Sequence, residues 1–184
     1  MMIEKPEHEE SVILVDEHDN VIGTMPKMEA HLAGKLHRAF SVFIFNTNGE
    51  LLLQRRAEDK YHSGGQWTNT CCSHPRLGEE TPNAANRRLN EEMGMECKLE
   101  YGFNFTYHAE LASDISENEY DHVFFGISNQ LPNPNPEEVS EFRYVNMADL
   151  EQDIKARPEI YTEWLKICFD RIIEYYNRYL FKKP

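Results

Sequence analysis

Two apolar runs joined by a short polar turn constrain the fold of this chain more than any other feature. Residues 39–45 (AFSVFIF) and 51–56 (LLLQRR) are mainly apolar, and the link between them, NTNGE, contains asparagine and glycine. Both residue types tolerate the positive φ angles that tight turns between strands require. The pattern predicts a β-hairpin within a larger sheet.

Other segments predict further strands and a set of helices. Strands are predicted at residues 11–17, 115–127 and 141–146, and a turn at 18–23 leads into one more strand. Helices are predicted at residues 81–94, 146–158 and 162–180. Because the two types do not alternate regularly, we expect an α/β (α+β) fold with a mixed β-sheet between helices. A single domain is predicted for residues 1–184, with its core at about 11–181.

Composition narrows the class of protein. The chain has 184 residues, 40% of them hydrophobic, and a mean hydropathy of -0.66, as in ordinary globular proteins. No apolar run approaches the roughly 20 residues that span a bilayer, and the acidic amino terminus does not resemble a signal peptide. We therefore expect a cytoplasmic protein that does not enter membranes. The formal net charge of -13 argues against nucleic acid as a partner, because the phosphate backbone would be repelled.

A pair of adjacent cysteines stands close to a histidine in the segment TNTCCSHP. The chain has four cysteines, too few for a disulfide framework in a chain of this size, so free thiols are expected. On an extended segment, side chains two residues apart point to the same side, so Cys72 and His74 could face one cavity. The alternative is that Cys72 is a small buried hydrophobic residue and His74 a turn residue.

Two carboxylates and further histidines could complete a metal site. Glu117 and Glu119 are two apart on a predicted strand, and like charges on one face repel unless a cation or a shared proton lies between them. With His31, His37 and His74 they form a plausible set of three nitrogen and two oxygen ligands for a divalent metal. The alternatives are a solvated strand edge for the carboxylates and surface positions for the histidines.

The helix predicted at 81–94 has clear ends and charged pairs along one side. Thr81 can cap it, Pro82 fits its first position, and Gly94 ends it. The charged pairs, at i,i+4 spacing, are Arg87 with Glu91 and Arg88 with Glu92. They can be read as a solvated ion-paired face.

The same segment, residues 73–95, also resembles a degenerate Nudix box, the loop-helix-loop that holds Mg²⁺ on a diphosphate. The matching positions are Glu79, Arg87, Glu91, Glu92 and Gly94. The segment departs from that pattern at Ser73, where a glycine is expected, and at Arg88, where a glutamate helps to bind the metal and activate water in Nudix hydrolases.

Taken jointly, the motifs resemble those of the type I isopentenyl diphosphate isomerases. They are EAHLAGKLHRAF, WTNTCCSHP, the altered Nudix helix and SENEYDHVF, and the likeness runs from about residue 13 to the last helix. The resemblance implies a Nudix-like fold and the interconversion of isopentenyl and dimethylallyl diphosphate in isoprenoid biosynthesis. Such a reaction adds a proton at one carbon of the alkene and removes one at another.

The resemblance also implies catalytic and metal-binding roles. Cys72 and Glu119 would transfer the protons, with Tyr107 as a polar helper, while Cys71 occupies a position that need not be cysteine. One divalent metal, Mg²⁺, Mn²⁺ or Zn²⁺, would be held by His31, His37, His74, Glu117 and Glu119. The spacing from His31 to His37 is one residue shorter than in some relatives, a difference that the loop would absorb.

Substrate-binding roles follow from the same resemblance. The π-face of Trp164 would stabilise cationic charge. Glu92 would hold a second ion, Mg²⁺, that bridges to the diphosphate. The basic residues expected to face the diphosphate are Lys27, Arg56, Lys60 and Arg88. From the residues alone, Trp164 could equally anchor the last helix in the core, and the basic residues could simply be solvated.

Two other functions stay open at this point. A Nudix hydrolase would cleave a diphosphate with Mg²⁺ and water, although Arg88 replaces its central glutamate. A metal-binding protein without catalysis would retain the ion but be indifferent to replacement of Cys72. In each enzymatic case the partner is a small diphosphate, and we expect a monomer.

Overall fold

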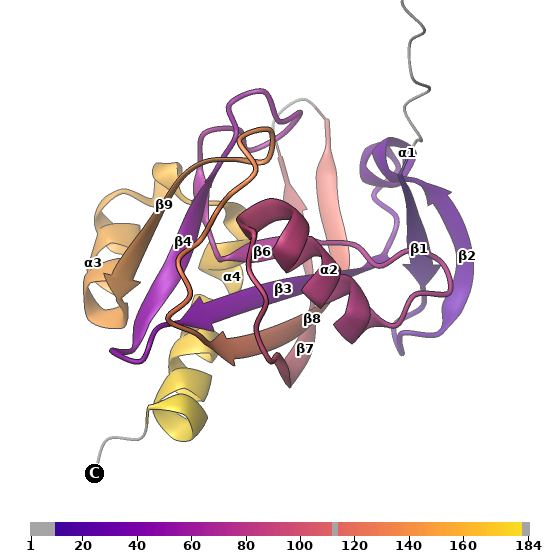
Figure 1. Ribbon diagram of the computed structural model, residues 1–184. Helices are drawn as coiled ribbons and strands as arrows, with labels where there is room; N and C mark the ends of the chain where they lie inside the picture. The colour runs from indigo at the N-terminus through magenta and orange to yellow at the C-terminus, as the bar shows by residue number, and fades with distance from the viewer. Residues whose placement is uncertain (1–9, 112–113, 182–184) are drawn as a thin grey trace, which may run out of the picture.

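The protein folds around one mixed β-sheet with helices on both faces. The computed structural model describes residues 10–111 and 114–181 (Figure 1). Within these residues the sheet has nine strands: β1 (Ser11–Val15), β2 (Val21–Pro26), β3 (His37–Phe45), β4 (Glu50–Arg56), β5 (Trp67–Thr68), β6 (Cys71–Ser73), β7 (Glu100–Glu110), β8 (Ser116–Ile127) and β9 (Val139–Asn146). The α-helices are α1 (Lys27–Leu32), α2 (Thr81–Met93), α3 (Met147–Ala156) and α4 (Glu163–Tyr175).

Strand β3 is the centre of the sheet. It runs parallel to β8 from the pair His37 and Glu119 to the pair Phe45 and Ile127, and antiparallel to β6, where Ser41 lies opposite Cys72. Strand β8 also pairs with β7, and these two strands are antiparallel. These pairings bring side chains from distant parts of the sequence to one end of the sheet.

The predicted hairpin is confirmed at its turn but not along its strands. Asn46 N–H donates to Glu50 O across the turn, yet β3 and β4 share only the pair Phe45 and Leu51. Strand β4 instead pairs with β9 over seven residues and with β5. Leu51, Leu52 and Leu53 are all fully buried. Both faces of β4 are therefore covered. The strand forms a part of the sheet with β5 and β9, away from β3.

The two faces of the sheet are covered by different helices, as the sequence predicts. Alternate residues of β3 point to opposite sides: Phe43 and Phe45 pack with residues of α3 and α4, whereas Val42 and Ile44 pack with residues of α2. Figure 1 shows α2 in front of the sheet and α4 behind it. The period of two in β3 thus supplies apolar contacts to both layers.

Three details differ from the sequence-based expectation. Glu80, not Thr81, occupies the N-cap of α2, so Thr81 and Pro82 are its first two helical residues. The last helix ends at Tyr175 and continues as a π-helical turn (Tyr176–Leu180). Strand β7 was not predicted, because glycine and asparagine interrupt its apolar pattern and a register shift lies between Tyr101 and Phe103.

The predictions about membranes and targeting are tested only in part. No helix within residues 10–111 and 114–181 is long and apolar enough to cross a membrane. The acidic segment on which the absence of a signal peptide was predicted is residues 1–11, of which residues 1–9 lie outside the described residues.

Gly94 ends α2 as predicted, and its replacement should be costly. Its φ is +61°, and its N–H donates to Asn90 O at 2.9 Å. A Cβ at this position would collide with the backbone carbonyl of Asn133. We expect Gly94→Ala to lower the free energy of unfolding by about 2 kcal/mol or more, because it adds this clash to a left-handed backbone. Denaturant unfolding measures the change.

Gly23→Ala is the matched control, because a Cβ there would meet nothing within 4 Å. It should change stability by no more than about 0.5 kcal/mol. Equal effects at the two positions would show that the Gly94 conformation does not matter.

Candidate active site

The predicted metal ligands come together from separate elements at one end of the sheet. His31 lies on α1, His37 begins β3, His74 follows β6, and Glu117 and Glu119 lie on β8. Ring centroids are 5.1 Å apart for His31 and His37 and also for His37 and His74. The short spacing between His31 and His37 therefore does not prevent the two rings from meeting.

These side chains direct their ligand atoms at one another. Donor atoms of His31, His37, His74 and Glu119 all lie within 4.8 Å of one another. Nε2 of His74 is 3.0 Å, and Nε2 of His37 3.5 Å, from Oε1 of Glu119. Oε2 of Glu117 is 3.7 Å from Nε2 of His31. As predicted from their spacing on the strand, both carboxylates are on the inward face of β8, 3% and 7% exposed.

Several of these atoms need a partner that the described residues do not provide. Nε2 of His31, Nε2 of His37 and Oε2 of Glu117 are buried without a hydrogen-bond partner in this part of the chain. Unsatisfied buried polar atoms are costly, whereas converging lone pairs of imidazole and carboxylate suit a divalent cation. Nδ1 of His37 lies 2.8 Å from Lys35 O, which leaves Nε2 available. The donor set thus fits the metal centre that the sequence predicts.

Burial sets the protonation of this cluster. It lowers the pKa of His31 to about 3 and that of His74 to about 4, so both rings are neutral near pH 7. Neutral imidazole is the form that binds metals. Burial would raise the pKa of Glu119, but the imidazoles of His37 and His74 beside it hold that pKa well below its usual range. Glu119 therefore carries negative charge, while burial and the charge of Glu119 raise the pKa of Glu117.

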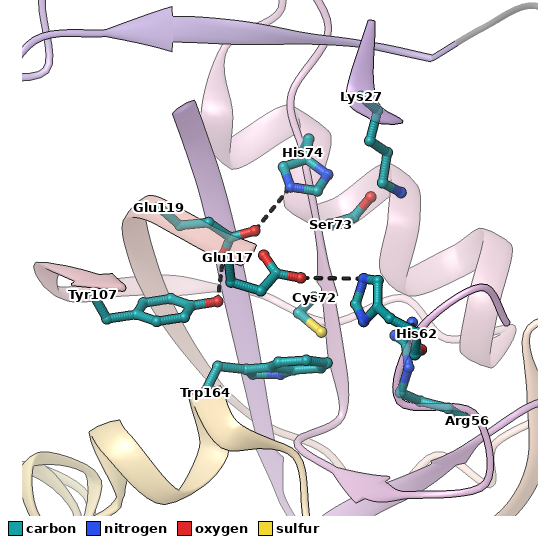
Figure 2. A pocket seen from close by; sticks show the side chains of 10 residues that line it. All are labelled: Lys27, Arg56, His62, Cys72, Ser73, His74, Tyr107, Glu117, Glu119 and Trp164. Atoms are coloured by element: carbon teal, nitrogen blue, oxygen red, sulfur yellow. Dashed lines mark hydrogen bonds and ion pairs between the residues drawn. The ribbon is translucent and has the colours of Figure 1, made fainter. Parts of the chain in front are cut away.

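The predicted catalytic side chains line the same pocket (Figure 2). The hydroxyl of Tyr107 donates to Oε2 of Glu119 at 2.7 Å. Cys72 packs against a buried cluster that contains Tyr107 and Trp164. Burial raises the pKa of the Cys72 thiol, which therefore keeps its proton. A protonated thiol and a charged carboxylate thus face one cavity.

The strand explains why only one cysteine of the adjacent pair reaches the pocket. Side chains alternate along β6, so Cys71 points into the core beneath α2, where it is fully buried. Cys72 and His74 both line the pocket, as their spacing predicts. Trp164 also lines the pocket, although it is only 4% exposed. It is therefore both a core residue and part of the pocket wall.

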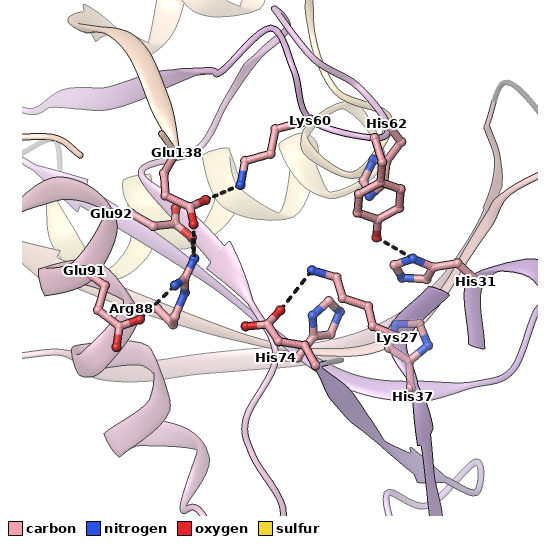
Figure 3. Close-up of polar contacts among 12 residues, drawn as sticks. Lys27, His31, His37, Lys60, His62, His74, Arg88, Glu91, Glu92 and Glu138 are labelled. Atoms are coloured by element: carbon pink, nitrogen blue, oxygen red, sulfur yellow. Dashed lines mark hydrogen bonds and ion pairs between the residues drawn. The ribbon is translucent and has the colours of Figure 1, made fainter. Parts of the chain in front are cut away.

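The basic residues divide into two groups. Lys27 and Arg56 line the pocket, and the guanidinium of Arg56 lies 5.3 Å from the ring centroid of Trp164. Lys60 and Arg88 belong to an adjacent ion-pair network around Glu138 (Figure 3). The structure therefore places two of the four predicted cations in the pocket and two beside it.

Comparison with known proteins identifies the family. The family model of the NUDIX domain matches residues 35–165. Over 165 residues the chain is 52% identical to Isopentenyl-diphosphate Delta-isomerase 2 of Aromatoleum aromaticum, and the match covers 90% of this chain and 87% of that protein. The chain belongs to the isopentenyl-diphosphate Delta-isomerase family. A member from Pectobacterium atrosepticum is 49% identical over 168 residues, covering 91% of this chain and 94% of that protein.

A solved structure supports the Nudix fold of this family member. The crystal structure of DR0079 from Deinococcus radiodurans superposes with a TM-score of 0.74 at 21% identity, covering 88% of this chain and 98% of that one. At this identity the likeness concerns the fold alone. Together with the NUDIX match, it confirms the predicted Nudix-like sheet between helices.

The altered Nudix helix of this isomerase-family chain forms the two predicted ion pairs and a hydrogen bond to Gln54 on strand β4. Arg87 and Glu91 are 3.2 Å apart, and Arg88 and Glu92 2.6 Å apart. Both oxygens of Glu92 accept hydrogen bonds, one from Arg88 and the other from Gln54 at 2.9 Å. Glu92 is thus engaged by protein donors at the position where a second ion is predicted.

Sequence reasoning missed two residues that contact the group of predicted metal ligands. Tyr61 and His62 lie in the loop between β4 and β5, and they contact His31 and Glu117, respectively. Their segment, KYHSGG, has neither helical nor strand periodicity, so the direction of its side chains could not be predicted. The only signal was the presence of another histidine close to the cysteine motif.

Proposed function

We propose that the protein interconverts isopentenyl diphosphate and dimethylallyl diphosphate, as its relatives' names indicate for them. The observation that carries this proposal is that Cys72 and the Tyr107–Glu119 pair line one pocket with Trp164. The family membership favours this isomerase activity over hydrolysis of a diphosphate. The substrate is a small diphosphate, and the activity belongs to isoprenoid biosynthesis.

The proposed reaction needs an acid and a base that act at different carbons. One group adds a proton to the terminal CH₂ of the alkene, which leaves positive charge at the tertiary carbon. Another removes a proton from the adjacent CH₂ on the diphosphate side, so the double bond moves and the formula is unchanged. The Cys72 thiol and the Glu119 carboxylate, hydrogen-bonded to Tyr107, are the two groups that we assign to these steps.

The walls of the pocket suit a cationic transition state. An unactivated alkene is a poor base, so positive charge must be stabilised and protected from water while it exists. Trp164 offers an aromatic face for that charge. Its burial and that of Tyr107 also limit access of water to the reacting carbons.

We assign the metal centre to His31, His37, His74, Glu117 and Glu119. A divalent ion held there, Mg²⁺, Mn²⁺ or Zn²⁺, would fix the geometry of Glu119 and tune its affinity for a proton. Ligand atoms of the three histidines and Glu119 lie within 4.8 Å of one another, and Glu117 joins them through a separate group with His31, which supports this assignment.

We further propose that the diphosphate is bound at the mouth of the pocket. Lys27 and Arg56 line the cavity, and Lys60 and Arg88 lie in the adjoining network. A second Mg²⁺ would be held by Glu92, whose two oxygens each accept one side-chain hydrogen bond and keep further lone pairs. Arg88, beside this carboxylate, would bind phosphate oxygens of the substrate.

Two further expectations complete the proposal. We propose that the protein acts as a monomer in the cytoplasm, as the sequence led us to expect. Light scattering of the purified protein and fractionation of its source cells would check these two points.

The proposal is tested by the products of the purified protein. Incubation with isopentenyl diphosphate and Mg²⁺ should yield dimethylallyl diphosphate without release of phosphate, both measured by phosphorus and proton NMR. Released phosphate with no new alkene would overturn the proposal in favour of hydrolysis.

Removal of divalent metal should abolish most of the turnover. We expect chelation followed by desalting to lower kcat by about 100-fold or more, because a metal supplies several kcal/mol of charge stabilisation. Addition of Mn²⁺ or Mg²⁺ should restore the rate. Full activity of protein shown by mass spectrometry of its metals to be metal-free would contradict the assignment.

A further inference from the structure

The loop between β4 and β5 contacts two of the predicted metal ligands, His31 and Glu117, and hydrogen bonds link its two ends. Gly65 N–H donates to Arg56 O at 3.0 Å, and Arg55 Nε donates to Gly65 O at 2.8 Å. Gly65 has a φ of +75°, and a Cβ on Gly64 would collide with the backbone of Glu58. These contacts fix the path of residues 57–66, which include Tyr61 and His62.

Tyr61 contacts the far side of one metal ligand. Its hydroxyl lies 2.6 Å from Nδ1 of His31, and the two rings are stacked with centroids 5.8 Å apart. This contact occupies Nδ1 and leaves Nε2 of His31, which is buried and unpartnered within the described chain, directed toward Glu117.

His62 contacts the far side of another ligand. Its Nε2 is 3.1 Å from Oε1 of Glu117, and its side chain is only 7% exposed (Figure 2). The ring also packs edge-on against Trp164, with centroids 6.0 Å apart. The contact leaves Oε2 of Glu117 free to face His31.

We propose that Tyr61 and His62 are positioning residues of the metal centre, a proposal that rests on the function proposed above. Tyr61 orients His31 through its hydrogen bond with Nδ1, and His62 orients Glu117 through the close approach of its Nε2 to Oε1. Partners of this kind commonly change metal affinity 10- to 100-fold, as an order of magnitude. Because both residues belong to one fixed loop, the loop orients two ligands at once.

We assign His62 a positioning rather than a ligating role. The possible ligand atoms fall into two groups, one of His31, His37, His74 and Glu119 and one of His31, His62 and Glu117, so His62 reaches the first group through the residues of the second. It approaches Glu117 at the oxygen opposite the one that faces His31. In a positioning role, His62 would leave Oε2 of Glu117 available to hold the ion.

The test measures binding of Mn²⁺ alone by electron paramagnetic resonance. Tyr61→Phe removes one hydroxyl, His62→Phe removes the ring nitrogens, and His62→Gln retains an N–H donor. We expect the Kd for Mn²⁺ to rise about tenfold or more in the two phenylalanine variants. His62→Gln should remain within about threefold of the wild-type protein, because its amide can still donate to Glu117.

Matched controls are available at exposed positions. Tyr179→Phe and His108→Phe make the same chemical changes where the side chains are largely exposed, and they should leave the Kd unchanged. Thermal unfolding of the metal-free proteins separates positioning from folding. Lower metal-free stability of the Tyr61 and His62 variants with an unchanged Kd would overturn the proposal.

Two further outcomes would also be decisive. Loss of intensity or displacement of the visible bands of the Co²⁺-loaded protein in His62→Gln would mean that His62 is itself a ligand, which contradicts a positioning role. Failure of the wild-type protein to bind Mn²⁺ would overturn the metal centre itself, whereas equal binding by wild type and phenylalanine variants would overturn only the present inference.

Discussion

Replacement of Cys72 by alanine is expected to lower kcat for isopentenyl diphosphate at least about 1,000-fold, within the range for loss of a proton donor. The physical reason is that the thiol keeps its proton because it is buried, and that it lines the same cavity as the Tyr107–Glu119 pair. KM should change little, because the thiol is not assigned to the diphosphate. Steady-state kinetics measures both quantities.

Cys71→Ala is the matched control for this experiment. Cys71 is fully buried beneath α2 and points away from the pocket. Its replacement should cost about 1 kcal/mol of stability through lost packing and leave kcat within about threefold. If Cys72→Ala were as active as Cys71→Ala, the thiol could not be the acid or base of the reaction.

Glu119→Gln should have a comparable effect for two combined reasons. The substitution removes the negative charge that His37 and His74 stabilise, and with it the proposed base and a proposed metal ligand. We expect kcat to fall about 1,000-fold or more and the Kd for Mn²⁺ to rise at least tenfold. Kinetics at saturating Mn²⁺ separates the two losses.

Kinetics at saturating Mn²⁺ shows whether Glu119 matters mainly as a base or mainly as a metal ligand. If Glu119 acts as a base, turnover of Glu119→Gln should remain low even when the metal site is filled. Full recovery at high Mn²⁺ would mean that Glu119 only binds the ion. Glu110→Gln provides the control, because Glu110 is on the neighbouring strand β7 and its side chain is 74% exposed.

Local patterns predicted the parts of the site that depend on strand period. The spacing of two placed Glu117 with Glu119 on one face, and Cys72 with His74 toward one cavity, and the structure agrees for both pairs. The meeting of these pairs with His37 depends on the parallel pairing of β3 and β8, whose residues are far apart in sequence. The residue types suggested in advance that these side chains could share a metal, and the family resemblance implied the same set, but neither predicted the strand pairing that brings them together.

The layers of the fold and most of its elements were predicted, but helix α1, strand β7 and the strand order were not. The turn between β3 and β4 followed from its asparagine and glycine, but its composition does not reveal that β4 leaves β3 to pair with β9. That choice is set by burial of both faces of β4, a property of the whole fold. Tyr61 and His62 were missed for a related reason, since a loop without periodicity gives no information on side-chain direction.

The most direct test of the proposed mechanism is the reaction in D₂O, followed by proton and deuterium NMR, with the wild-type protein and Cys72→Ala. The account predicts that wild type forms dimethylallyl diphosphate with deuterium in a methyl group derived from the terminal CH₂, and that the variant forms almost none. Product without deuterium in either methyl group at early times, or equal labelling by the variant, would contradict proton transfer from an exchangeable acid that depends on Cys72.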